Sequence, residues 1–474
     1  MAKTVTPDLC VLGAGATGLS IAAGAAQMGA ETVLVEKGRM GGDCLNYGCV
    51  PSKSLLAAGK AAKAHVLAGR LGVHYPPPRI DYRAVHDHVR GVIAGIAPQD
   101  SVERFEGLGV TVIQAAARFV GPREVEAGDA RIRARRFVVA TGSQPSVPPI
   151  PGLERVPYLT NETVFDLTER PEHLIVIGGG PIGCELGQAF RLLGARVSIV
   201  EMNAILPRDD PELVDILRGC LRADGIELVE GVKAVGVEGA EGRVALRIER
   251  DGIAASLAGS TLLLAAGRQP TVDNLDLEAA GIDYDDRGIK VDARLRTSNK
   301  RVFAAGDVSG GYQFTHMGTY HAGIVIRNAL FRLPAKVDTR AMPWVTYTDP
   351  ELAHVGLSEA AAREAHGRIR VLRWPFAEID RARTERKTDG LVKAVVTPQG
   401  RILGASILGP NAGELIHAWV LARSQGLKIA AMARMIAPYP TLGEASKRAA
   451  GSYYAPKLFS ARTKWLVRLL SRLG

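Results

Sequence analysis

Two cysteines in a glycine-rich segment have the residue type and spacing for redox or metal chemistry. Cys44 and Cys49 lie in the run GGDCLNYGCVPSK, residues 41–53. In a reducing compartment such a pair is metal-binding or redox-active, and no nearby third and fourth ligands complete a zinc set. We therefore favour a redox pair over a metal site or core packing. The helical rise between the two is about 7.5 Å, whereas bridged Cα atoms lie within about 7 Å. A disulfide here requires a distorted helix, and Gly48 supplies the freedom.

Two units of the same layout surround this segment in the sequence. Residues 8–36 and residues 174–201 each read as buried strand, glycine turn, helix, strand and terminal acid. In such a unit the first glycine makes the turn, the second admits a pyrophosphate, and the third lets helix and strand pack closely. The helix N-terminus adds free N–H groups. The glycines are Gly13, Gly15 and Gly18 in the first unit, and Gly178, Gly180 and Gly183 in the second.

The acids that end the two units predict which nucleotides bind. Glu36 and Glu201 each follow their glycine turn by about 20 residues, where an acid accepts hydrogen bonds from a ribose 2′-hydroxyl. At the second site a glutamate repels a 2′-phosphate, which favours NAD over NADP. Two dinucleotide sites in one chain indicate electron transfer between two cofactors.

Composition limits the remaining classes of protein. The chain has 474 residues, 47% apolar and 23% charged, which suggests about three domains and excludes a disordered, collagen-like or coiled-coil chain. The formal net charge is +10, but we find no zinc-finger spacing or RNA-binding aromatic pattern and expect no nucleic-acid partner. Cys10, Cys184 and Cys220 sit singly in apolar surroundings and are expected to pack in the core. No apolar run approaches a membrane span and no signal peptide is evident, so we expect a cytoplasmic protein.

The expected fold class is α/β, with two Rossmann-like domains and a C-terminal α+β domain. A proline-rich stretch near residue 150 reads as a linker, and a second crossing between domains lies near residue 270. These two points indicate that the second domain is inserted into the first. We therefore expect a first nucleotide-binding domain at 1–150 and 271–340, a second at 151–270, and a further domain at 341–474.

The chain resembles the pyridine nucleotide–disulfide oxidoreductases, which include lipoamide dehydrogenase, glutathione reductase and mercuric reductase. The family pattern G-G-T-C-x-N-x-G-C-x-P-[ST]-K is matched at residues 41–53 except at Asp43. Other matches are A-T-G at 140–142, A-A-G-R at 265–268, A-G-D at 305–307 and Y-T-D-P-E at 347–351. The resemblance implies a glutathione-reductase-like fold, FAD at the first glycine motif, NAD or NADP at the second, and a homodimer formed through the C-terminal domain.

The resemblance also implies the roles of individual residues. Cys44 would attack a substrate disulfide, Cys49 would be the thiolate beside the flavin, and Lys53 would pair with Glu185 next to the flavin ring. Together they imply an FAD-dependent NAD(P)H:disulfide oxidoreductase that acts on a sulfur group, as lipoamide dehydrogenase does, in either direction. Further FAD contacts are implied for Gly42, Ala117, Thr141, Gly142, Asp307, Thr315 and His316, and a nicotinamide-nucleotide contact for Gly267.

Two departures bear on the substrate. The family's disulfide reductases carry a histidine base and a glutamate that orients it, in H-x-x-x-x-E. Here Tyr439 stands in the histidine's place and Glu444 is kept. A phenol with an ordinary pKa of about 10 is a poor base near neutrality. Mercuric reductases share this tyrosine but end in a Cys-Cys pair, which this chain does not have. A metal-ion reductase is the alternative, and a flavoprotein subunit serving another protein is a third hypothesis.

Two further features leave alternatives open. Asp43 beside Cys44 either raises the pKa of that thiol or caps the helix that carries it. In residues 460–474, apolar side chains follow one helical face while Lys464, Arg468 and Arg472 follow another. Such a basic amphipathic helix packs on its own dimer, or contacts a membrane or a partner protein.

Overall fold

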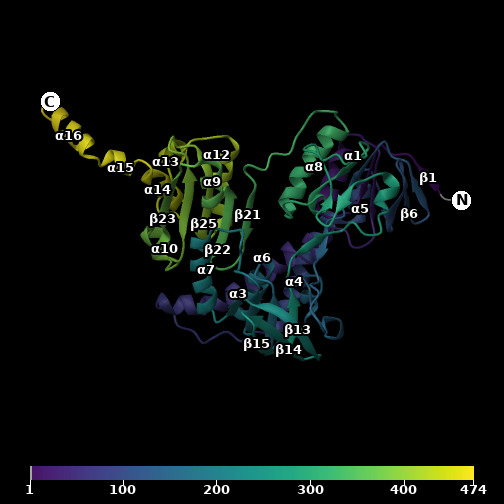
Figure 1. Cartoon of the computed structure of the whole chain (residues 1–474), viewed down its shortest axis with the longest axis horizontal. Helices are drawn as coiled ribbons and strands as arrows, with labels where there is room; N and C mark the ends of the chain where they lie inside the picture. Colours follow the sequence, from purple (N-terminus) through teal and green to yellow (C-terminus); the bar gives the residue numbers. More distant parts are fainter. Residues whose placement is uncertain (1–2, 474) are drawn as a thin grey trace.

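A computed structural model describes residues 3–473, which form three lobes and a projecting C-terminal segment (Figure 1). The first lobe is built on a five-stranded parallel sheet of order β20-β8-β2-β3-β4. Apolar side chains fill both faces of this sheet, as parallel sheets require. Its strands are β2 (Leu9–Leu12), β3 (Thr32–Glu36), β4 (Val110–Gln114), β8 (Arg136–Val139) and β20 (Val302–Ala304).

Helices and a smaller sheet complete the first lobe. A small-residue helix, α1, follows β2 and lies against α8, whose residues come more than 250 positions later. The smaller sheet has the order β1-β7-β6-β5. The elements are α1 (Ala16–Gln27), α5 (Val102–Gly107), α8 (Thr315–Ala329), β1 (Lys3–Val5), β5 (Ala117–Gly121), β6 (Glu124–Ala127) and β7 (Ala130–Ile132). The helix α4 (Tyr82–Ile96) packs instead on the second lobe, where its Val89 and Ile93 share a core with Phe190 (Figure 1).

The second lobe repeats the strand–helix–strand plan of the first. Its parallel sheet has the order β12-β11-β10-β16, and an antiparallel sheet β13-β14-β15 lies beside it. The elements are β10 (His173–Ile177), α6 (Pro181–Leu192), β11 (Arg196–Glu201), α7 (Pro211–Ala223), β12 (Glu227–Glu230), β13 (Lys233–Ala240), β14 (Arg243–Arg250), β15 (Ile253–Gly259) and β16 (Thr261–Leu264).

The chain passes from the sheet of the first lobe to the sheet of the second and back at one place. The outgoing strand β9 (Ser143–Pro145) pairs antiparallel with the returning strand β17 (Arg268–Pro270). All strands of the second lobe lie between these two in the sequence. After the return, β20 pairs with β8 and completes the first sheet. The expected α/β class with an additional C-terminal unit is therefore confirmed, while the exact domain bounds stay predictions.

The third lobe is an antiparallel sheet covered by helices. Its order is β21-β22-β25-β24-β23, and its core centres on Trp419 and Phe376. The strands are β21 (Pro343–Thr346), β22 (Glu351–Gly356), β23 (Arg370–Pro375), β24 (Leu391–Val396) and β25 (Ile402–Gly409). The helices are α9 (Glu359–His366), α10 (Asp380–Thr384), α11 (Ala412–Leu415), α12 (His417–Ser424), α13 (Ile429–Arg434) and α14 (Glu444–Ser452).

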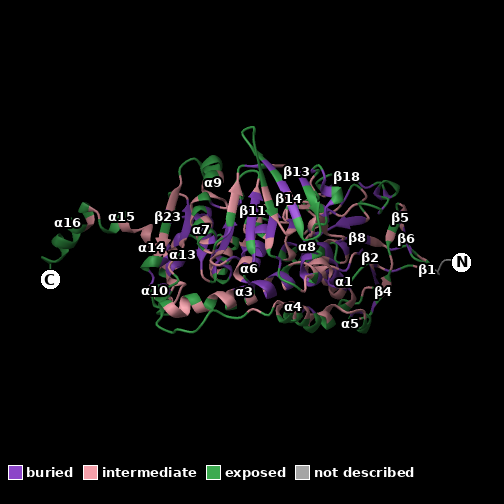
Figure 2. Cartoon of the chain, turned by 90° about the horizontal axis from the view of Figure 1, so that it is seen from below, coloured by how far each residue is buried: buried purple, intermediate pink, exposed green. Residues whose placement is uncertain are grey.

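Beyond the third lobe the chain continues as two short helices, α15 (Ala455–Leu458) and α16 (Ala461–Leu470). They project away from the body of the molecule, and their surface is mostly exposed (Figure 2). Among residues 3–473, no helix combines the length and apolar character needed to cross a bilayer.

Candidate active site

The two glycine loops have the same strained geometry. Gly13 and Gly178 begin them with φ of +105° and +112°, a region that favours glycine. A Cβ added to Gly18 would lie 1.8 Å from the Gly13 carbonyl oxygen, and one added to Gly183 would lie 1.9 Å from that of Gly178. Only glycine therefore lets α1 and α6 pack this closely on the preceding strand.

The middle glycine of each loop faces open space. A Cβ on Gly15 would meet nothing closer than 3.9 Å, and one on Gly180 nothing within 4 Å. Both residues cap a helix whose first-turn N–H groups have no intrahelical partner. Each loop thus offers a backbone cradle for a diphosphate, which fits a dinucleotide at both places.

The acid that ends each unit is held by the loop beside it. Glu36 accepts the N–H of Ala14 at 2.6 Å, and Glu201 accepts the N–H of Gly179 at 2.7 Å. Each carboxylate is therefore fixed at the carboxyl end of its strand, at the edge of the cradle. This is the position from which an acid reaches a nucleotide ribose.

A single cavity of about 1810 Å³ joins the two cradles to the cysteine pair. Most residues singled out in the sequence line it. They are Gly13, Gly15, Glu36, Gly42, Cys44, Cys49, Lys53, Thr141, Gly142, Gly178, Gly180, Glu185, Glu201, Gly267, Asp307, Thr315 and His316.

Some of the predicted site residues do not line this cavity. Gly18 and Gly183 act instead through helix packing, as described above. Ala117 lies in β5 and packs against the core beside the first sheet. It does not line the cavity, and its contact with FAD stays a prediction. The two remaining residues, Tyr439 and Glu444, belong to the third lobe.

A break in the helix brings the two thiols together. Cys44 lies in the short helix α2 (Gly42–Asn46), and Cys49 is the first residue of the next helix, α3 (Cys49–Arg70). Gly48 between them has φ −122° and ψ −111°, which is not helical. Both cysteines are free thiols that hydrogen-bond one another. The predicted distortion at Gly48 is thus observed.

The two thiols have opposite acidities. A hydrogen bond from Cys44 lowers the pKa of Cys49 to about 6, helped by the Thr315 hydroxyl at 3.4 Å and by the charge of Lys53. The hydrogen bond to Cys49, followed by burial, raises the pKa of Cys44. At neutral pH the pair therefore holds one proton, on Cys44, and the thiolate is on Cys49.

Lys53 is held beside Cys49 by an ion pair across the lobes. Its Nζ lies 2.5 Å from Oε2 of Glu185, a residue of α6. The Glu185 side chain is only 6% exposed. The second carboxylate oxygen of Glu185 accepts the N–H of Tyr347 at 2.9 Å, and Lys53 Nζ lies 4.5 Å from the centre of the Tyr347 ring. The predicted pair of Lys53 with Glu185 is present, and the third lobe helps to position it.

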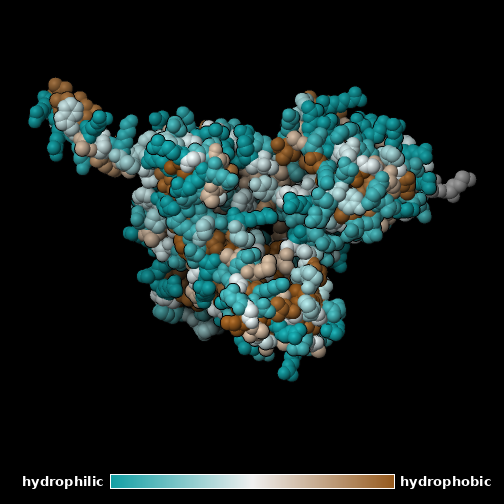
Figure 3. All heavy atoms as spheres, viewed as in Figure 1, coloured by the Kyte–Doolittle hydropathy of each residue, from teal (hydrophilic) through white to brown (hydrophobic). Residues whose placement is uncertain are grey.

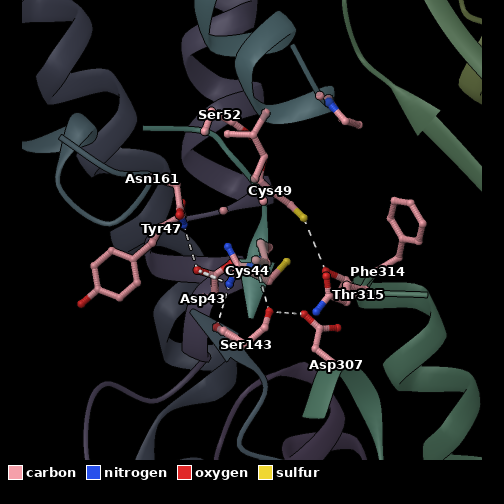
Figure 4. Close-up of a pocket in the computed structure, with 18 of the residues that line it drawn as sticks. Asp43, Cys44, Tyr47, Cys49, Ser52, Ser143, Asn161, Asp307, Phe314 and Thr315 are labelled. Atoms are coloured by element: carbon pink, nitrogen blue, oxygen red, sulfur yellow. Dashed lines mark hydrogen bonds and ion pairs between the residues drawn. The ribbon is translucent and has the colours of Figure 1, made fainter. Parts of the chain in front are cut away.

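Asp43 does neither of the two things expected of it. It makes no side-chain cap of α2, and the raised pKa of Cys44 comes from Cys49 and burial instead. Its carboxylate pairs with Arg268 at 3.2 Å and accepts from Asn161 at 3.0 Å (Figure 4). Asp43 thus ties the cysteine segment to the crossing strand β17.

The same arginine extends this network toward the first nucleotide site. Arg268 donates to Ser143 Oγ at 2.8 Å, and Ser143 donates to Asp307 Oδ2 at 2.6 Å. Figure 4 shows Ser143 between Asp307 and the cysteine segment. Sequence reasoning missed Ser143, Arg268 and Asn161 as site residues, although A-A-G-R had marked the position of the arginine.

Two histidines reach the cavity from different lobes. His316 lies in the first turn of α8, where its Nε2 lies 2.8 Å from the Pro343 carbonyl oxygen and its ring stacks on Phe314. His417, which no sequence motif marks as a site residue, also lines the cavity, at the start of α12. The first turn of a helix at the cavity wall is the feature that His316 and His417 share.

Tyr439 lies on the surface of its own chain. Its side chain is 70% exposed, and its hydroxyl donates to Asp380 Oδ2 at 3.1 Å, which raises the pKa of the phenol. Glu444 begins α14, and its buried Oε2 has no hydrogen-bond partner among the described residues. The phenol is therefore protonated at neutral pH, and its proton is directed to a carboxylate.

Two family patterns cover most of the chain. Residues 7–322 match the pattern described as pyridine nucleotide-disulphide oxidoreductase, and residues 342–450 match the dimerisation domain of the same family. The chain belongs to this family. Like other pyridine nucleotide-disulphide oxidoreductases, the protein uses FAD and a pyridine nucleotide, and its third lobe is a homodimerisation domain.

Curated relatives and solved structures of the family extend over nearly the whole chain. A mercuric reductase of Streptomyces lividans is 35% identical over 463 residues, covering 94% of this chain and 96% of the relative. A dihydrolipoyl dehydrogenase of Thermus scotoductus is 36% identical over 465 residues, with 94% and 97% covered. A Cu(II) complex of RclA, an HOCl-induced flavoprotein disulfide reductase of Escherichia coli, superposes with a TM-score of 0.84 at 29% identity, covering 93% and 98%. This pyridine nucleotide-disulphide oxidoreductase is an FAD-dependent enzyme of disulfide chemistry.

Proposed function

We propose that the enzyme is an NADH-dependent reductase in which Cys44 and Cys49 pass electrons to a disulfide substrate. The observation that carries the proposal is the cavity, because the two thiols, the Lys53–Glu185 pair and both nucleotide cradles line it together. Bound FAD supplies the two-electron link between the nicotinamide and the cysteine pair. The described thiols at Cys10, Cys184 and Cys220 are also free, which fits a reducing, cytoplasmic setting.

The cysteine pair carries out the exchange in two steps. Cys44 passes its proton to Cys49 along their hydrogen bond and attacks one substrate sulfur as a thiolate, which breaks the substrate disulfide and releases the first substrate sulfur as a thiolate. Cys49 then loses this proton to solvent and attacks the Cys44 sulfur in the mixed disulfide. The second substrate sulfur leaves as a thiolate, and a Cys44–Cys49 disulfide remains. Two electrons from NADH restore the dithiol. Each time the dithiol is restored, the charge of Lys53 stabilises the thiolate of Cys49.

Tyr439 stands where the family's disulfide reductases carry their histidine base, and this replacement narrows the class of disulfide. A phenol whose pKa is raised by Asp380 does not act as a base or relay at neutral pH. A departing thiol of low pKa leaves as a thiolate without a general acid, whereas an alkyl thiol leaves more slowly. We therefore propose that the enzyme prefers disulfides of acidic thiols over lipoamide and glutathione disulfide.

A substrate panel tests this proposal. The holoenzyme is reduced with NADH under anaerobic conditions and mixed with an aromatic disulfide, lipoamide, glutathione disulfide, Hg²⁺ or Cu²⁺. We expect the aromatic disulfide to reoxidise the dithiol at least about tenfold faster than lipoamide. Equal rates with all three disulfides would contradict the leaving-group argument, and no reaction with any of them would contradict disulfide reduction.

A metal-ion reductase is the second candidate function. It is favoured by the mercuric reductase relatives and by the Cu(II) complex of RclA. Against it, no cluster of three or more ligand side chains suited to a metal ion occurs among residues 3–473. Faster reoxidation of the dithiol by Hg²⁺ or Cu²⁺ than by every disulfide in the panel would favour it.

Glu201 predicts the choice of pyridine nucleotide. Its carboxylate is fixed at the edge of the second cradle, where the 2′-phosphate of NADPH would meet a like charge. We expect kcat/KM for NADH to exceed that for NADPH by at least about tenfold. Steady-state rates with both nucleotides check this, and Glu201→Gln is expected to narrow the ratio. Equal or better use of NADPH by the wild type would contradict it.

A further inference from the structure

The C-terminal tail, residues 455–474, is the largest feature that the proposed function does not use. The dimerisation-domain pattern of the family ends at residue 450, before the tail begins. Ser460 caps α16 by accepting the N–H of Thr463 at 3.2 Å. Figure 1 shows α15 and α16 extending from the third lobe, on the side away from the first lobe.

The tail exposes large apolar side chains. No residue of α16 is buried, and Trp465 is 64% exposed. Hydrophobic atoms gather at the tip of the tail, which stands clear of the rest of the surface (Figure 3). A ten-residue helix with no buried face is marginal in water, so an apolar partner surface is needed to stabilise it. The exposed apolar residues are Leu458, Phe459, Trp465, Leu466, Val467, Leu469, Leu470 and Leu473.

The apolar and basic side chains occupy different sides of α16. At 100° per residue, Trp465 and Leu469 lie on one side of α16 with Leu466 and Leu470 beside them. Lys464 and Arg468 lie on the adjacent side, and Arg472, just beyond the end of the helix, continues their spacing of four residues in the sequence. Trp465 lies at the boundary between the two sides. Its indole is suited to a membrane interface, where the acyl chains are apolar and the headgroups are polar.

The charge of the tail identifies the partner. The tail has five basic residues and no aspartate or glutamate, so it carries half of the chain's formal net charge of +10. A second copy of the chain is itself basic and brings a second tail of the same sign, which opposes packing of one tail against the other. An anionic lipid surface offers both the negative charge and the apolar layer. The basic residues are Lys457, Arg462, Lys464, Arg468 and Arg472.

We propose that the tail docks the enzyme on bilayers rich in anionic phospholipid. The helix α16 lies in the plane of the interface, with Trp465 and its leucines among the upper acyl chains and the basic side at the lipid phosphates. A homodimer carries two tails, so binding is strengthened wherever both reach one surface. No described residue of the tail lines the cavity, so docking changes where the reductase works and not its chemistry.

Vesicle co-sedimentation of the holoenzyme tests this proposal. Wild-type enzyme is compared with a chain truncated after Ser460, on vesicles of phosphatidylglycerol with phosphatidylcholine and on phosphatidylcholine alone. We expect the truncation to weaken binding to the anionic vesicles at least about tenfold and to leave NADH oxidation in solution unchanged. Wild-type binding is expected to fall at 0.5 M salt and on phosphatidylcholine alone.

Substitutions separate this surface from general charge. The triple variant Lys464→Gln, Arg468→Gln and Arg472→Gln is expected to lose binding as the truncation does. A matched variant with Arg79, Arg123 and Arg243 changed to glutamine removes the same charge at exposed positions elsewhere and is expected to bind like the wild type. In the wild type, the fluorescence of Trp465 is expected to shift to the blue on anionic vesicles, measured against Trp465→Phe.

Three results would overturn the proposal. They are wild-type enzyme that ignores anionic vesicles, a truncated chain that binds them equally, and a truncated chain that becomes monomeric by light scattering. The last would show that the tail packs on its own dimer. Since NADH oxidation is measured in the absence of vesicles, failure of docking leaves the proposed reductase function standing.

Discussion

Cys49→Ser is expected to abolish the long-wavelength absorbance that a thiolate gives beside bound FAD after reduction by NADH. Cys49 is the acidic member of the pair, with a pKa of about 6, and a serine hydroxyl does not ionise at neutral pH. Substrate-dependent NADH oxidation is expected to fall at least about 10³-fold, because the exchange loses one of its two sulfurs. Anaerobic titration with NADH, followed by absorbance spectroscopy and steady-state rates, measures both effects.

The partner cysteine gives a different pattern. Cys44→Ser is expected to stop turnover to the same extent but to keep the long-wavelength absorbance, because Cys49 and Lys53 remain and a serine hydroxyl still donates to the thiolate. Cys220→Ser is the matched control, because that thiol lies on α7, away from the cavity, and its pKa is raised to about 11 by burial. If the absorbance persists in Cys49→Ser, the assignment of the thiolate to Cys49 is wrong.

Lys53→Met is expected to shift the acid limit of the same absorbance upward. In the wild type the thiolate is present above about pH 6 and is lost as the pH falls through that value. The lysine charge lowers the pKa of Cys49, so its removal raises that pKa and moves the loss of the absorbance to higher pH. Absorbance of the NADH-reduced variant between pH 5 and pH 9 measures the shift.

The same substitution is expected to destabilise the fold. It leaves Glu185, 6% exposed, without its cation. Breaking a buried pair costs about 3–5 kcal/mol, and the 35% exposure of Lys53 reduces this to about 1–3 kcal/mol. Lys60→Met is the matched control on the same helix, because Lys60 pairs with Glu351 at 3.6 Å and does not line the cavity. An unchanged pH midpoint in Lys53→Met would show that Lys53 does not act on the thiolate.

Local sequence patterns predicted most of the active site. Each glycine loop is specified by residues within about 30 positions of one another, so turn, helix start and terminal acid could be read together. The break at Gly48 followed from the geometry of a helix and of a disulfide. The pair of Lys53 with Glu185 spans 132 positions and came only from family resemblance.

Contacts between distant segments could not be predicted in this way. Asp43 and Arg268 meet because β9 and β17 pair at the crossing, and no local pattern indicates that pairing. The position of Asp43 next to Cys44 suggested either a helix cap or an effect on the pKa of the thiol. In the structure the Asp43 carboxylate pairs instead with Arg268, which is distant in the sequence. His417 was missed for the same reason, since its place in the cavity depends on how the third lobe meets the others.

The β9–β17 pair makes the second lobe an inserted module. The chain leaves the first lobe at Ser143–Pro145 and returns at Arg268–Pro270, and the hydrogen bonds between these strands close everything between them into one long loop. Loop-closure entropy grows only slowly with length, so the first lobe tolerates an insertion of this size at little thermodynamic cost. The insertion is nevertheless anchored a second time, because Leu55 and Leu56 of α3 share a hydrophobic core with Phe190 of α6. The position of the second lobe is therefore fixed by this core as well as by the strand pair.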